Sequence, residues 1–270
     1  MAKHLNRKQL KLKRVVLERE NFPIYHKTLI MKTISQAFRF FGLALICILF
    51  SFTLSAQSIS GSGNVVEKDR NISGFTAIQV SSGVDVHIKQ GNSDKVIVKT
   101  DDNLQDRIKT ELSGGTLKIT AKGSIRKAKA FDVYITAKNL TEISASSGSD
   151  VEGDGTLAFD KLRLNMSSGS DVELSIDAQE LHCELSSGSD ADLEGKVGKL
   201  VVKASGGSDL KAKSLQVQDC KLRVSGGSDA FVNVNGDLDM EASGASDIHY
   251  SGSPSVVHSR ATGASDIHGN

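Results

Sequence analysis

The chain has 270 residues, with 33 Lys and Arg, 32 Asp and Glu, and no Trp. Counted from residue 57 onward, it carries 23 basic and 30 acidic side chains, a net charge of about −7. Because the phosphates of nucleic acids need a basic protein surface, this charge argues against a nucleic-acid partner.

The N-terminal segment predicts export. A basic stretch with Lys32 and Arg39 leads into an apolar run from Phe40 to Leu54, and the small residue Ala56 follows. The run has the length of a signal-peptide core and is shorter than the roughly 20 residues of a membrane-spanning helix. The alternative is that the segment is retained as an N-terminal membrane anchor.

Three segments follow from this interpretation. Residues 1–30 are an upstream extension, residues 31–56 are the signal peptide, and residues 57–270 are a single domain without a transmembrane span. We therefore expect an exported protein in the periplasm, on the outer-membrane surface or in the medium.

The first part of the domain predicts short strands. Apolar and polar residues alternate in Phe75–Val80, Val84–Ile88 and Phe131–Ile135, as on a strand with one buried face. A helical turn is expected only within Asp101–Ile108.

Regular repeats occupy residues 141–270. Ser146-Ser147-Gly148-Ser149-Asp150 is the first of seven copies of one motif, whose aspartates are 21, 19, 19, 20, 18 and 19 residues apart. The motif aspartates, here called the Asp ladder, are Asp150, Asp171, Asp190, Asp209, Asp229, Asp247 and Asp266.

Short strands at this period predict an all-β fold, a parallel β-helix or β-solenoid with coils of about 19–21 residues. Each coil would stack on the next at about 4.8 Å and bury its inward side chains against its neighbours. Cys183 and Cys220 have inward parity but lie about two coils apart, too far for a disulfide, so we expect buried free thiols.

The opening of the domain resembles a known family. Gly61–Val66, Arg70, Gly74–Val80 and Asp85–Gly91 are similar to the start of the putative auto-transporter adhesin, head GIN domain family. The resemblance extends over nearly all of residues 60–270. It implies an exported protein of the kind common in Bacteroidetes, a right-handed β-helix and no established activity.

The Asp ladder is the most conspicuous candidate site. Carboxylates stacked one coil apart would lie about 5 Å from each other and repel unless something compensates their charge. Hydrogen bonds from Ser hydroxyls and backbone N–H groups in turns are favoured, because Asp and Ser next to Gly are turn residues. Calcium bound between coils is the alternative, and no other cofactor is expected.

A second candidate is a metal site at the C-terminal end. The pairs Asp247/His249 and Asp266/His268 are 19 residues apart, and with Ile248 and Ile267 inward all four would point outward. Two imidazoles and two carboxylates suit zinc, nickel or copper. The alternative is that repeats copy surface residues without a function. Asp85-Val86-His87 echoes the same pattern.

Two classes of function remain. The first is a structural or adhesin-like binding surface of the envelope, whose partners would be surface glycans or another envelope protein. The second is a polysaccharide lyase or hydrolase on the same fold. Such enzymes need aromatic residues that stack on sugars and a cleft, and no nucleophile–base pair stands out, so we expect no catalysis. We also expect self-association through the C-terminal edge of the solenoid, because open strand edges pair with other chains.

Overall fold

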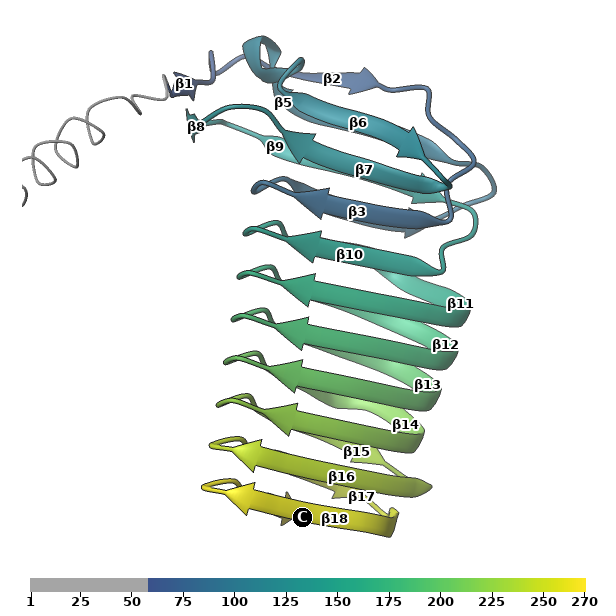
Figure 1. Ribbon diagram of the computed structural model, residues 1–270. Helices are drawn as coiled ribbons and strands as arrows, with labels where there is room; N and C mark the ends of the chain where they lie inside the picture. The colour runs from purple at the N-terminus through teal and green to yellow at the C-terminus, as the bar shows by residue number, and fades with distance from the viewer. Residues whose placement is uncertain (1–57) are drawn as a thin grey trace, which may run out of the picture. The chain divides into compact units, whose positions relative to one another are not determined.

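The repeats form successive coils of a β-solenoid of about seven turns. The structure is a computed structural model that describes residues 58–270, and the predicted extension and signal peptide at 1–56 lie outside this range. Figure 1 shows the coils stacked in chain order from β10 to β18. The prediction of an all-β solenoid is confirmed.

Two faces of parallel strands run along the stack, and both belong to one continuous 17-stranded sheet. The first face contains one strand of each coil and the second face the other, with the long strands β11–β14 bending from the second face to the first. The first face comprises β3 (Ala77–Ser81), β10 (Glu142–Ser146), the C-terminal parts of β11 (Val151–Ser167), β12 (Val172–Ser186), β13 (Ala191–Ser205) and β14 (Leu210–Ser225), then β16 (Asp237–Gly244) and β18 (Ser255–Gly263). The second face comprises β4 (Asp85–Gln90), the N-terminal parts of β11–β14, β15 (Ala230–Val234), β17 (Ile248–Gly252) and β19 (Ile267–Gly269).

Residues 91–141 are inserted between β4 and β10 and build a cap on the first coil (Figure 1). Within the cap, β7 pairs parallel to β3 and β9 pairs parallel to β4, so both faces continue into it. The other contacts are antiparallel: β2 with β5, β5 with β9, and β6 with β7. The cap elements are β5 (Lys95–Asp101), the 3-10 turn η1 (Asp102–Leu104), β6 (Ile108–Ser113), β7 (Thr116–Ala121), β8 (Ile125–Lys127) and β9 (Phe131–Ala137), joined by β2 (Val65–Asp69) and by β1 (Ile59–Ser60) on β8.

The core consists of apolar ladders along the axis. Leu164, Cys183, Val202, Leu222 and Met240 occupy equivalent positions of successive coils, and each is at most 1% exposed. Because successive side chains of a strand point to opposite faces, every second residue lies in a continuous interior, where neighbouring coils bury each other's side chains.

The two cysteines are free and buried, as predicted. They lie in different ladders, since Cys183 pairs with Leu164 and Cys220 pairs with Leu200. Burial raises the pKa of the Cys183 thiol to about 12 and also raises the pKa of Cys220. Both thiols are therefore uncharged and unreactive in the folded protein.

The repeated motif forms the turn between the two faces. Its second residue has a positive φ in every coil, for example 58° at Ser168 and 72° at Gly206, and the following Gly169 has 68°. The next serine points inward. The serines at this fourth position of the motif are completely buried in six coils, and the seventh, Ser265, is 7% exposed. The six are Ser149, Ser170, Ser189, Ser208, Ser228 and Ser246.

Candidate functional site

The Asp ladder lies at the start of each strand of the second face. In every step, one carboxylate Oδ1 of an aspartate accepts a hydrogen bond from the backbone N–H of the next aspartate in the ladder, at 3.0–3.2 Å. Hydrogen bonds between an ionised carboxylate and an N–H are stronger than neutral ones and offset the repulsion between stacked charges. Lys211 adds an ion pair with Asp190 at 3.2 Å, which raises the pKa of the lysine.

The serine hydroxyls have a different role from the one predicted. They point into the solenoid and bind backbone groups, and no hydrogen bond joins them to the ladder carboxylates within residues 58–270. The Oγ of Ser189, for example, donates to the carbonyl of Met166 and accepts the N–H of Ser186, both at 3.0 Å. Backbone amides therefore supply the hydrogen bonds that join successive aspartates of the ladder, and the Lys211 ammonium group adds one to Asp190.

Because the ladder carboxylates already have hydrogen-bond donors, the fold is expected to be stable without divalent cations. A chelator should leave the melting temperature unchanged relative to millimolar calcium. If calcium bridged the coils, its stabilisation would instead grow as RT ln(1 + [L]/Kd), about 2.7 kcal/mol at a hundredfold excess over Kd. A calcium-dependent shift above about 10 °C that Asp190→Asn with Asp209→Asn abolishes would contradict this expectation.

The four C-terminal candidates share one edge of the second face. Asp247 accepts the N–H of Asp266, and the imidazoles of His249 and His268 stack with ring centroids 5.0 Å apart. The stack continues to Phe231, whose ring lies 4.7 Å from that of His249. In the described part of the chain, no three His, Cys, Asp or Glu side chains converge in a way that could hold a metal ion. The metal site therefore stays a prediction.

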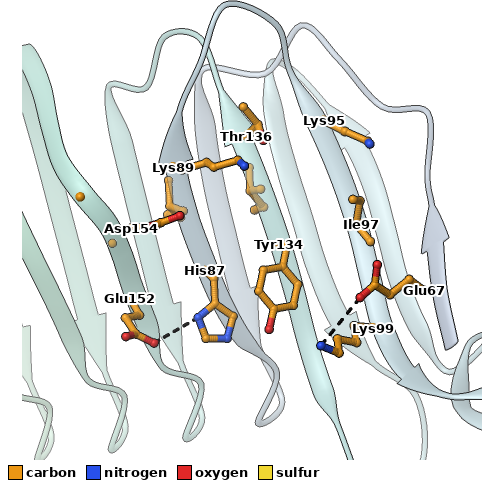
Figure 2. Close-up of a pocket in the computed structure, with 14 residues that line it drawn as sticks. Glu67, His87, Lys89, Lys95, Ile97, Lys99, Tyr134, Thr136, Glu152 and Asp154 are labelled. Carbon is orange, nitrogen blue, oxygen red and sulfur yellow. Dashed lines mark ion pairs between the residues drawn. The ribbon is translucent and has the colours of Figure 1, made fainter. Parts of the chain in front are cut away.

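A cavity of about 550 Å³ opens on the second face where the cap meets the first coils (Figure 2). It extends over the outward side chains of β2, β5, β9, β4 and β11, five strands that are hydrogen-bonded side by side. Its lining is Glu67, His87, Ile88, Lys89, Lys95, Ile97, Lys99, Tyr134, Ile135, Thr136, Glu152, Gly153, Asp154 and Gly155.

A bulge in β11 forms one wall of this cavity. Between the pairs Glu152/Glu173 and Thr156/Ser175, β11 contains two more residues than β12. Gly153, Asp154 and Gly155 therefore lie in an irregular segment, and Gly155 has a φ of 79°. Bulges of this kind interrupt a sheet locally and redirect side chains, often beside functional sites.

The centre of the cavity is an aromatic pair. His87 stacks on Tyr134 with ring centroids 4.6 Å apart, and the ammonium group of Lys99 lies 5.5 Å from the Tyr134 ring. The two nitrogens of His87 face carboxylates, Nδ1 at 3.1 Å from Glu152 and Nε2 at 3.4 Å from Asp132. Tyr134 is 38% exposed, so ligands can reach it.

A row of acidic residues borders the pair. Asp85 is half-buried beside His87, and burial, followed by repulsion from Asp150, raises the pKa of its carboxyl group. Asp132 adds to this effect. On the other side, Lys99 pairs with Glu67 at 3.7 Å. The lining residues in the described part of the chain offer ion pairs, hydrogen bonds and the aromatic surface of the His87–Tyr134 pair.

The sequence pointed to this site only in part. Asp85-Val86-His87 echoes the C-terminal Asp–His pairs, but no motif marks Tyr134 or the lysines. The available signal was the spacing of 21 residues between Asp150 and Asp171, because the usual coil has 19 and the two additional residues form the bulge.

The fold and the outward-facing ladders define a repeat β-solenoid with a lateral cavity beside its cap. Residues 74–254 match the family described as putative auto-transporter adhesin, head GIN domain, and the chain belongs to this family. A comparison with curated proteins finds no match.

Solved structures share the fold. A putative adhesin from Bacteroides fragilis is 21% identical with a TM-score of 0.75, covering 79% of this chain and all of its own. A putative adhesin from Parabacteroides merdae is 17% identical with a TM-score of 0.63, covering 78% of this chain and 99% of its own. A protein of Parabacteroides distasonis described as a putative lipid binding protein is 21% identical with a TM-score of 0.63, covering 78% and 100%. These identities establish the fold alone.

No helix within residues 58–270 is long and apolar enough to cross a membrane.

Proposed function

We propose that this protein is exported to the cell envelope and acts there as a non-catalytic, adhesin-like binding protein. Its partner is a surface glycan or another envelope protein. The observation that carries the proposal is the cavity, in which side chains from five paired strands surround the reachable ring of Tyr134. A cavity of 300–1,000 Å³ with fixed polar groups is typical of a ligand-binding site.

The lining favours a polar ligand over a lipid chain. Ile88 and Ile135 lie beneath the cavity and are each 1% exposed, so Ile97 is the isoleucine of the lining that faces the cavity, whereas six of the fourteen lining residues carry a charge. Burying an acyl chain against these groups would remove their water without replacing its hydrogen bonds. We therefore propose an adhesin-like function, as in the descriptions of two structural neighbours, and not the lipid binding named for the third.

The alternative enzyme on this scaffold would need a nucleophile or an acid–base pair of carboxylates beside the substrate. In the cavity, Glu152 is engaged with His87, and Glu67 with Lys99. The two glutamates thus lie in separate ion pairs and do not form a facing acid–base pair of carboxylates, which supports a binding function.

Export and attachment are expected together. The protein recovered from the envelope or the medium should begin at Gln57, as read by mass spectrometry, because the small residue Ala56 precedes the predicted cleavage site. Ala56→Arg should block the cleavage.

A deletion strain should adhere less to surfaces coated with the cells' own surface polysaccharides or envelope proteins. An uncleaved protein confined to the cytoplasm, or unchanged adherence, would refute the proposal.

Self-association through the C-terminal edge is a further part of the proposal. All nine residues of β18 are exposed, among them Val256 at 45% and Val257 at 59%. Unpaired strand edges with apolar residues favour pairing with another chain. Light scattering of the purified protein is expected to show a mass that rises with concentration, and a constant monomer mass would count against it.

A further inference from the structure

One row of the cavity is cationic. Lys89, Thr136 and Lys95 occupy directly paired positions on β4, β9 and β5, three neighbouring strands. Adjacent strands lie about 4.8 Å apart, so the two lysines are separated by a single strand that carries the threonine. Figure 2 shows their side chains on either side of Thr136.

The charge of this row is largely uncompensated. Lys89 forms no ion pair with any residue of the range 58–270, and Lys95 reaches only Asp69, at 3.9 Å, with 54% of its side chain exposed. By contrast, the acidic residues around the aromatic pair already face His87 or Lys99. An exposed pair of this length contributes little energy, so both ammonium groups are available to a ligand.

The next row supplies a different surface. His87 and Tyr134 lie two residues before Lys89 and Thr136 on the same strands, and therefore on the same side of the sheet. A ligand that spans both rows meets two ammonium groups and a hydroxyl at one end and an aromatic ring at the other. The bulge residue Asp154 borders the cavity and forms no ion pair among the described residues. Its carboxylate repels anionic groups of a ligand that come close to it. A ligand with widely spaced anionic groups therefore fits better than a dense polyanion.

We infer that the cavity binds an acidic glycan, a sugar chain with carboxylate groups. A carboxylate lies between Lys89 and Lys95, where charge-assisted hydrogen bonds form, and Thr136 hydrogen-bonds to it or to a hydroxyl group. The sugar ring contacts Tyr134. This inference rests on the proposed binding function and names the class of ligand for it.

Calorimetry with two matched oligosaccharides tests the inference. The purified protein is titrated with a hexamer of galacturonate and with the same hexamer after reduction of its carboxyl groups. We expect the acidic hexamer to bind and the reduced one to bind at least tenfold more weakly. The double variant Lys89→Gln/Lys95→Gln should weaken binding of the acidic hexamer at least tenfold at low salt.

Lys196→Gln/Lys203→Gln is the matched control. It removes two charges from surface ion pairs with Asp177 and Glu184, away from the cavity, and should bind as the unchanged protein does. Melting curves show whether each variant is folded, and the single variant Lys89→Gln, which breaks no ion pair, should weaken binding without destabilisation.

The outcomes separate this inference from the proposed function. Equal binding of both hexamers, binding insensitive to Lys89→Gln, or no binding of either would overturn the inference. The adherence measured with the deletion strain would then still stand. Shortening of the hexamer during incubation would instead overturn the non-catalytic part of the proposed function.

Discussion

Gly195→Ala is expected to lower the free energy of unfolding by about 3–5 kcal/mol, a loss of the size that a severe backbone conflict produces. Gly195 has a φ of 104° and lies opposite Ile176 of the preceding coil. A Cβ atom at this position would lie only 2.2 Å from the Ile176 carbonyl oxygen. Both coils would have to separate there, and the conflict would spread to the adjacent backbone contacts.

Gly169→Ala is the matched control for this variant. Its φ of 68° is also positive, but a Cβ there meets no atom within 4 Å. It should cost only about 1–2 kcal/mol, the ordinary penalty of a left-handed backbone for an L-residue. Urea denaturation followed by circular dichroism measures both variants. Equal losses would show that the close approach between coils is not what requires glycine at position 195.

Ser189→Ala should cost about 1–3 kcal/mol, although it removes a single oxygen atom. The substitution leaves the carbonyl of Met166 and the N–H of Ser186 without the partner that each has at 3.0 Å. Ser189 is completely buried, so water cannot replace the lost bonds without entering the core.

The neighbouring Ser186→Ala is the control, because the Ser186 side chain is only half-buried and its backbone N–H remains in place. Its effect is expected within about 0.5 kcal/mol, as for most surface substitutions. Thermal denaturation measures the loss of stability of both variants. If Ser189→Ala lost no more stability than Ser186→Ala, the inward serines would merely fill space in the turn, and their hydrogen bonds would not stabilise it.

The repeat period was sufficient to predict the solenoid. The nearly constant spacing of the aspartates and the strict alternation in segments such as 162–166 determine which residues face inward, because a one-residue slip would reverse both faces. The structure places Leu162, Leu164 and Met166 in the core in agreement with that pattern.

The sequence does not predict which hydrogen-bond donors offset the repulsion between the carboxylates of the Asp ladder. Its position and one-coil spacing followed from the sequence, whereas the choice of donor depends on the backbone orientation in the turn. With Ser168 and Gly169 both at positive φ, the next serine turns inward and the N–H of Asp171 points to Asp150.

The cap and the cavity depend on pairing between distant segments. The alternation at Phe131–Ile135 predicts a strand, but nothing local indicates that β9 joins β4, about 45 residues earlier in the chain. The cavity exists because this pairing brings Tyr134 beside His87 while β11 bulges away. No single segment of the sequence contains its lysines and its aromatic pair together.

The bond from each ladder carboxylate to the next backbone amide makes the coils interchangeable. A coil that accepts and donates in the same way as its neighbours can be copied or lost without a new interface. Each such event changes the length of the protein by about 4.8 Å. The number of coils is therefore a trait that unequal recombination between repeated stretches of the gene can adjust in one step, and with it the distance between the cap and the far end.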